Sequence, residues 1–209
     1  MGLIISKNIV NFFVSFCNQK DCEKLQQIPG QIGNMVKVNM VSRSGRHLQR
    51  YNGTCRQVVG CIPYRYTKTD QFSSVEDLEV LLISSQKSQR MMFPKGGWEL
   101  DESMEDAALR ETLEEAGVRG KVERELGKWA YLSKRGGIVH EGYMFPMLVN
   151  EQLDVWPEKD LRKRRWMSVA QAREVCQYSW MKEALDKLVH RQREMHLKQN
   201  EEKDEARCT

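Results

Sequence analysis

The sequence predicts a globular α+β fold or an α/β sandwich, and its length, composition and pattern support this. A chain of 209 residues has room for one domain of roughly 150 residues with extensions. Hydrophobic residues make up 40% and charged residues 30%, which is ordinary for a globular protein and argues against wholesale disorder. The β-rich runs are mixed with few helical segments and do not form a regular βαβ series. No run approaches the roughly 18 to 20 apolar residues that a membrane span needs.

The strands are expected in short runs rich in β-branched, aromatic and aliphatic residues. These runs cover residues 55–66, 78–84, 91–94, 122–132, 137–149 and 164–167. Pro63 indicates an edge or a strand end in the first run, and the turn at residues 134–137 joins the two longest late strands. Helices are expected after Gly97, over residues 169–176, and from Trp180 to about His196.

The helix after Gly97 has recognisable start and stop signals. Ser103 followed three residues later by Asp106 resembles a capping box, and Gly117 is placed to end the helix. At 100° per residue, one arc is expected to be buried and consists of Ala108, Leu109, Thr112, Leu113 and Ala116. Glu111, Glu114 and Glu115 fall together on the neighbouring arc.

This helix lies in an acidic stretch of an otherwise basic chain. Residues 99–115 contain eight acids and one base, a net charge of −7, which leaves +11 for the rest of a chain whose total is +4. Like charges at helical spacing repel each other, and a solvated acidic face would usually alternate them with bases. Oxygen ligands suit hard divalent cations such as Mg²⁺, so the pattern favours a metal site over a solvated face.

The acidic stretch carries a motif of fixed spacing. Gly96-x5-Glu102-x7-Arg110-Glu111-Thr112-x-Glu114-Glu115-x-Gly117-Val118 resembles the Nudix box, G-x5-E-x7-R-E-U-x-E-E-x-G-U, and departs from it at Thr112, where a bulky aliphatic residue is usual. The resemblance extends over roughly residues 50–188 and implies a mixed β-sheet between helices. It also implies hydrolysis of a diphosphate linked to another moiety.

The resemblance assigns roles to the residues of the motif. Glu111 and Glu115 would hold Mg²⁺ or Mn²⁺ together with the Gly96 carbonyl. Glu114 would bind a metal or act as base on the attacking water, so all three glutamates are candidate catalytic residues. Arg110 and Glu102 would orient the helix glutamates.

The surrounding residues narrow the resemblance to one subfamily. Residues 93–99 (FPKGGWE), 59–65 (VGCIPYR) and 156–158 (WPE) are similar to diphosphoinositol polyphosphate phosphohydrolases of the plant type. This implies a small-molecule polyphosphate substrate, either a diphosphoinositol polyphosphate or a dinucleoside polyphosphate such as diadenosine penta- or hexaphosphate. The alternatives are a catalytically weak polyphosphate-binding regulator and a pyrophosphatase for another nucleoside diphosphate derivative.

Several basic residues are candidates for binding the phosphates of such a substrate. Arginine suits phosphate because its fork donates two parallel hydrogen bonds. The candidates are Arg50, Arg56, Arg90, Lys95, Arg162, Lys163 and Arg164. Nucleic acid is not expected as a partner, because no interleaved aromatics or nucleic-acid module accompany the bases. His140 is a weak candidate for a base, and Cys55 and Cys61 are expected to be small core residues.

The ends of the chain are expected to be extensions of the domain at residues 50–188. Residues 1–45 are a flexible terminus or a targeting segment; the start, Met1-Gly2-Leu3-Ile4-Ile5-Ser6, fits the pattern for acylation of Gly2, which would give peripheral membrane contact. Residues 189–209 form a charged tail, expected as a fraying helix or disordered. Six cysteines without a C-x-x-C pair indicate reduced thiols, hence an intracellular protein of the cytoplasm or nucleus, with the mitochondrion or a membrane anchor as alternatives.

Overall fold

A computed structural model describes residues 42–43, 45–67, 74–86, 88–133 and 137–207. Most of the predicted extension 1–45, including Gly2, therefore lies outside the described residues, as does most of the turn at 134–137. No helix in the described ranges is long and apolar enough to cross a membrane.

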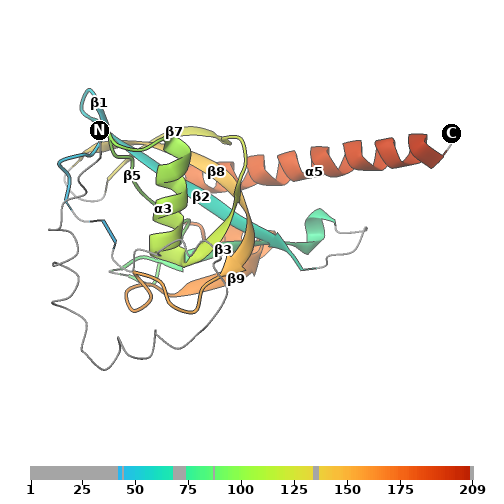
Figure 1. The fold of residues 1–209 in the computed structure, drawn as a ribbon, viewed down its shortest axis with the longest axis horizontal. Coiled ribbons are helices and arrows are strands. Elements are labelled where there is room, and N and C mark those ends of the chain that lie inside the picture. Colours follow the sequence, from blue (N-terminus) through green and yellow to red (C-terminus); the bar gives the residue numbers. More distant parts are fainter. Residues whose placement is uncertain (1–41, 44, 68–73, 87, 134–136, 208–209) are drawn as a thin grey trace, which may run out of the picture. The chain divides into compact units, whose positions relative to one another are not determined.

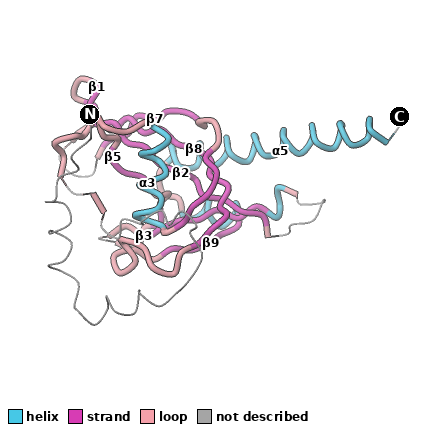
Figure 2. The backbone as a smooth tube through the Cα atoms, in the orientation of Figure 1, coloured by secondary structure: helices cyan, strands magenta, loops and turns pink. Residues whose placement is uncertain are grey.

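Nine strands of the described chain form one mixed sheet (Figures 1 and 2). They are β1 (Tyr51–Asn52), β2 (Cys55–Tyr66), β3 (Leu78–Ser84), β4 (Met91–Met92), β5 (Lys95–Gly97), β6 (Val118–Val122), β7 (Gly127–Leu132), β8 (Val139–Gln152) and β9 (Arg164–Ser168). The order is β4-β3-β2-β8-β6, with β1 and β5 also paired to β2, β7 to β8, and β9 to β3. The β2–β8 pair is parallel and every other pair is antiparallel, so the sheet is mixed.

The described helices are the 3-10 turn η2 (Val75–Asp77), α3 (Met104–Ala116), α4 (Val169–Val175) and α5 (Ser179–Arg207). Each strand contributes side chains to both faces of the sheet, because successive residues point to opposite sides. Along β3, Leu78, Val80 and Leu82 belong to one core cluster, whereas Leu81 and Ile83 belong to the other. The expected sheet between helices is confirmed.

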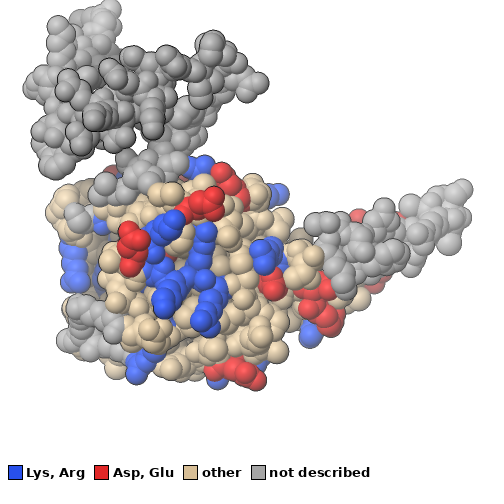
Figure 3. Space-filling view, turned by 90° about the horizontal axis from the view of Figure 1, so that it is seen from below, with Lys and Arg blue, Asp and Glu red and all other residues tan. Residues whose placement is uncertain are grey.

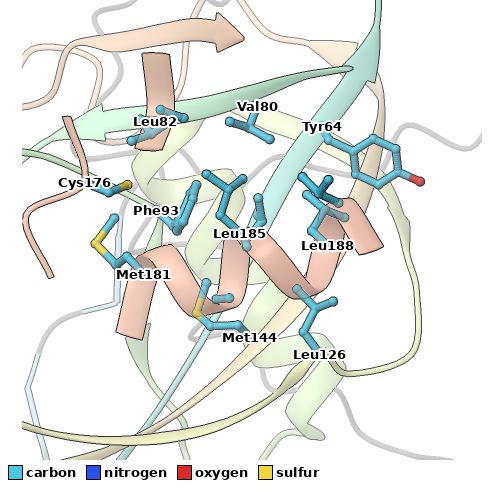
Figure 4. Packing of buried hydrophobic residues seen from close by; sticks show 14 of the residues in the cluster. Tyr64, Val80, Leu82, Phe93, Leu126, Met144, Cys176, Met181, Leu185 and Leu188 are labelled. Carbon is cyan, nitrogen blue, oxygen red and sulfur yellow. The ribbon is translucent and has the colours of Figure 1, made fainter. Parts of the chain in front are cut away.

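The core on the α4–α5 face explains how the long helix is held. Figure 4 shows Leu185 and Leu188 of α5 pointing toward Val80 and Tyr64 on the sheet. All four side chains are nearly inaccessible to solvent, so the hydrophobic effect drives this contact. On the other face, α3 packs through Ala107, Ala108 and Ala116 against strand residues such as Val59 and Phe145. Small residues on α3 let the helix lie close to the sheet.

The structure confirms the strands predicted at 55–66 and 78–84, and it has those predicted at 91–94, 137–149 and 164–167 with bounds shifted by a few residues. The strand predicted at 122–132 is divided, because Val122 ends β6 and only residues 127–132 form β7. Residues 118–122 form β6, of which only Val122 lies in a predicted strand; pairing with β8 supplies their backbone hydrogen bonds. β5 also forms despite its two glycines, through pairing with β2. The predicted helix 180–196 continues to Arg207 as α5, so the charged tail is helical there.

Candidate functional site

α3 begins and ends as the sequence predicts, with one difference at its start. Ser103 Oγ accepts a hydrogen bond from the Asp106 N–H at 3.0 Å, which satisfies a free donor of the first turn. The reciprocal half of the capping box is missing, because the short Asp106 carboxylate instead accepts from the Ser103 hydroxyl at 2.7 Å. Gly117 adopts φ 62° and ends the helix, its N–H donating to Leu113 O.

The buried arc of α3 is shifted from the predicted one. Ala107, Ala108, Thr112 and Ala116 are fully buried, whereas Leu109 and Leu113 are only partly buried. The glutamate face is covered as well: Glu114 is 8% exposed and Glu115 is 7% exposed. The acidic arc is therefore a buried face, and a solvated acidic surface is excluded for these two side chains.

Arg110 ties α3 to the segment that precedes it. It makes two hydrogen bonds to the Glu102 carboxylate, at 2.6 and 2.9 Å, and donates to the Gly97 carbonyl at 2.9 Å. Its Nη1 also donates to Glu111 at 2.8 Å, and Glu102 accepts from the Glu99 N–H at 3.1 Å. These contacts fix the side chains of Arg110 and Glu102 beside Glu111.

Strand β5 lies directly against the glutamates. Glu115 accepts from the Lys95 N–H at 2.8 Å, and the Glu111 carboxylate rests against Gly96. A Cβ built on Gly96 would lie 1.9 Å from Glu111 Oε2, so only glycine fits there without displacing the carboxylate.

Burial changes the protonation chemistry of these carboxylates. Burial is the largest cause, and the nearby charge of Glu111 adds to it. Together they raise the pKa of Glu114 to about 7 and that of Glu115 to about 8. Burial also raises the pKa of Glu111, against the opposing charge of Arg110. The three carboxylates repel one another when ionised, so nearby positive charge would stabilise them.

The donor set fits a hard divalent cation in its chemistry. Carboxylates and a backbone carbonyl are the oxygen ligands that Mg²⁺ and Mn²⁺ prefer. In the described ranges, however, no three His, Cys, Asp or Glu side chains are already arranged around a common metal position. Glu111 is paired with Arg110, and Glu115 is paired with Arg162. One carboxylate oxygen of each of these two glutamates therefore accepts from an arginine.

The loop before β9 closes over the C-terminal half of α3. The Glu158 N–H donates to the Glu114 carbonyl at 3.1 Å, and the Glu158 carboxylate pairs with Arg162. Trp156 packs against Gly117, where a Cβ would lie 2.5 Å from the indole. Arg43 adds a further contact, because its N–H donates to Glu114 at 3.3 Å. No role at the site was expected for Glu158 or Trp156, which the resemblance marks only as part of residues 156–158; the four-residue spacing of Glu158 and Arg162 was a further signal.

A cavity of about 660 Å³ adjoins this loop. Lys159, Arg162 and Lys163 line it together with the acidic Asp160 and polar residues of the loop after β3, such as Ser84 and Gln86. Arg162 connects the cavity to the glutamates, because it lines one and pairs with the other. Figure 3 shows Lys and Arg side chains gathered on one face of the molecule, with acidic side chains at the edge of the group.

The remaining predicted phosphate ligands are spread around the site. Arg164 donates to the carbonyls of Ala116, Gly117 and Leu153 at 2.9, 3.0 and 2.6 Å, and stacks on Trp156. It therefore clamps the end of α3 and does not line the cavity. Arg90 is exposed in the loop before β4.

Arg50 and Arg56 lie near the N-terminal end of the motif. Arg50 stacks on Trp98 with its guanidinium 4.2 Å from the ring centroid and donates to the carbonyls of Glu99 and Leu100. Arg56 donates to Gln49 at 2.7 Å, and its charge acts on Glu111. Together these contacts brace the segment from Trp98 to Leu100.

The weaker candidates are placed in ordinary environments. Cys61 is fully buried in the α3 core, and burial raises the pKa of its thiol to about 12, which does not suit a nucleophile. Burial, together with the charges of Arg56 and Lys95, lowers the pKa of His140 to about 4. His140 also packs edge-on against Tyr131.

This chain is similar in sequence and fold to known proteins. The NUDIX domain model matches residues 58–191. Nudix hydrolase 18, mitochondrial, of Arabidopsis thaliana is 60% identical over 165 residues, covering 79% of this chain and 94% of the relative. Diphosphoinositol polyphosphate phosphohydrolase 3-alpha of Mus musculus is 39% identical over 109 residues, covering 51% of this chain and 65% of the relative. The solved NUDIX hydrolase from Nitrosomonas europaea has a TM-score of 0.53 at 18% identity, covering 66% of this chain and 91% of that one, and shows the same fold.

Proposed function

The chain belongs to the NUDIX domain family and is a hydrolase, and we propose that it cleaves phosphoanhydride bonds in highly phosphorylated small molecules with the help of Mg²⁺ or Mn²⁺. The proposed substrates are diphosphoinositol polyphosphates, dinucleoside polyphosphates with five or six phosphates, or both. The single observation that carries the proposal is the set of buried carboxylates on α3 beside a cavity lined by three cations.

Each carboxylate has a proposed task. Glu111 and Glu115 would hold the metal with the Gly96 carbonyl, because both carboxylates lie against β5. A bound metal lowers the pKa of a coordinated water and neutralises the oxygens of the diphosphate. Glu102 pairs with Arg110, and Arg110 in turn donates to Glu111 and so would orient its carboxylate.

Glu114 is the proposed base. It is the least restrained of the three by ion pairs, with Arg110 at 3.8 Å and an N–H of Arg43 at 3.3 Å. A pKa of about 7 suits a group that must accept a proton near neutral pH. In the proposed step Glu114 takes a proton from water, the water oxygen bonds to phosphorus, and the anhydride P–O bond breaks. The electron pair of that bond stays with the departing phosphate.

The cavity supports a substrate with many phosphates. Lys159, Arg162 and Lys163 can neutralise several phosphate charges close to the glutamates. Positioning and charge neutralisation are the main requirements of phosphoryl transfer. The similarity to a diphosphoinositol polyphosphate phosphohydrolase of Mus musculus supports diphosphoinositol polyphosphates in particular.

The test compares Glu114→Gln and Glu115→Gln with the wild type on diphosphoinositol pentakisphosphate and on diadenosine hexaphosphate, with Mg²⁺ and with Mn²⁺. Glu105→Gln is the matched control, because Glu105 is an exposed glutamate on the first turn of the same helix. We expect both site variants to lose most turnover and the control to keep it. Full activity in both site variants would contradict the mechanism, and tight binding without turnover in the wild type would favour a polyphosphate-binding regulator.

We also propose that residues 1–45 act as a targeting segment, by organelle import or by acylation of Gly2. The mitochondrial relative supports import. A fusion of residues 1–45 to a fluorescent protein, with and without Gly2→Ala, separates these routes. Import would persist in the Gly2→Ala fusion, whereas membrane attachment through acylation would be lost.

A further inference from the structure

Arg162 lies between two carboxylates at the border of the cavity. Its Nη2 pairs with Glu115 and its Nε with Glu158, and its Nη1 donates to the Ser84 carbonyl at 3.2 Å. The side chain of Arg162 is 10% exposed, and those of Glu115 and Glu158 are 8% and 13% exposed. One guanidinium therefore pairs with two largely buried carboxylates.

The two carboxylates hold Arg162 in different ways. Glu158 lies four residues before Arg162 in the same loop, so this pair is local. Its carboxylate is also held by Gln86 at 3.2 Å. Glu115 comes from α3 and has a second partner, the N–H of Lys95. Without Glu115, Arg162 would still be paired with Glu158 and with the Ser84 carbonyl, beside Lys163 in the lining of the cavity.

Glu115 cannot serve two cations equally well. A guanidinium and a divalent cation on the same buried carboxylate would repel each other strongly, because charges interact more strongly away from water. In the described structure the cation on Glu115 is Arg162.

We propose that Arg162 is an exchangeable counter-ion of Glu115: it neutralises Glu115 in the metal-free protein and is released into the cavity, toward a substrate phosphate, when Glu115 becomes a metal ligand. The inference rests on the proposed function, since it requires Glu115 to bind metal. It makes Arg162 a positioning residue that couples metal occupancy to phosphate binding. A permanent structural pair would behave in the opposite way, because loss of Arg162 would then disorder Glu115 and weaken metal binding.

The experiment measures Mg²⁺ binding without substrate by isothermal titration calorimetry at pH 9, above the pKa of about 8 of Glu115. Arg162→Gln removes the competing charge, so we expect it to bind Mg²⁺ about tenfold more tightly than the wild type. Arg162→Lys keeps the charge and should bind like the wild type. Arg65→Gln is the matched control: it breaks the Arg65–Glu79 ion pair, and Arg65 is 44% exposed. It should leave Mg²⁺ affinity unchanged.

Two outcomes separate failure of this inference from failure of the proposed function. If Glu115→Gln weakens Mg²⁺ binding but Arg162→Gln binds no more tightly than the wild type, Arg162 is not an exchangeable counter-ion. If the wild type binds no Mg²⁺, or Glu115→Gln binds it equally well, the metal role of Glu115 fails and this inference with it. Should Arg162→Gln not fold, Arg162→Met is measured with the same expectation, and Arg162→Lys binding more tightly than the wild type would also overturn the inference.

Discussion

Gly96 and Glu111 are in such close contact that a Cβ on Gly96 would lie 1.9 Å from Oε2 and 2.1 Å from Cδ of Glu111. Gly96 is fixed in β5 opposite Val59, and the Glu111 carboxylate is held from the other side by Arg110. Neither partner can withdraw easily. The glycine of the motif is therefore required by the space that the carboxylate occupies.

Gly96→Ala should displace the Glu111 carboxylate and leave the strand in place. We expect turnover to fall by about 10- to 100-fold, the range seen when groups that position metal ligands are changed. Steady-state kinetics and circular dichroism would separate this from unfolding. Gly53→Asn is the control, since Gly53 has φ 58°, which asparagine tolerates, and a Cβ there meets nothing within 4 Å. Unchanged turnover in Gly96→Ala would show that Glu111 can move freely.

The metal-free protein should lose stability as the pH rises from about 6.5 to about 8. The folded pKa values of Glu114 and Glu115, about 7 and about 8, are above the ordinary value of 4.5, so the folded state holds protons that the unfolded state has released. Below pH 6.5 the lowered pKa of His140 acts in the opposite direction and masks part of the effect. Urea denaturation at several pH values without metal measures the slope.

Glu115→Gln should flatten this pH dependence, because its amide does not titrate. Added Mg²⁺ should oppose the loss of stability at high pH, since metal binding needs deprotonated ligands. A metal-free wild type whose stability rises between pH 6.5 and 8 would contradict the raised pKa values.

Arg164→Met should weaken the end of α3. It removes three hydrogen bonds to carbonyls and the stacking on Trp156, and we expect a loss of about 2 kcal/mol or more in the free energy of unfolding. If Arg164 acts only as a clamp, kcat falls while KM for the polyphosphate is little changed. A raised KM with unchanged stability would instead support the phosphate contact predicted from the sequence.

Tyr64→Phe should loosen α5. Tyr64 Oη donates to Glu123 and accepts from Gln192, whose side chain is 2% exposed and also accepts from Tyr66. Loss of the hydroxyl leaves a buried amide short of a partner, and we expect a cost of about 1–3 kcal/mol by urea denaturation. Tyr51→Phe, at a side chain that is 47% exposed, should cost far less. Equal effects of the two substitutions would argue against the network.

Local sequence patterns predicted those helices and strands that short-range signals specify. The continuous apolar run of β3 and the cap and stop signals of α3 were confirmed where they were expected. β6 and β5 could not be foreseen, because their polar and glycine residues become strand only through pairing with β8 and β2. The same holds for Leu109 and Leu113, whose partial burial depends on how α3 sits on the sheet.

The sequence by itself determined the spacing of Glu111, Glu114 and Glu115 on one helix and the excess of positive charge elsewhere, because helix geometry makes residues three and four apart neighbours. Only the tertiary structure decided what each charge does. The dense run at residues 162–165 looks uniform, yet Arg162 meets Glu115, Lys163 lines the cavity and Arg164 clamps α3. Burial, which raises the glutamate pKa values, also comes from segments distant in sequence. The role of each charged side chain depends on which residues surround it, and folding brings those residues together from distant parts of the sequence.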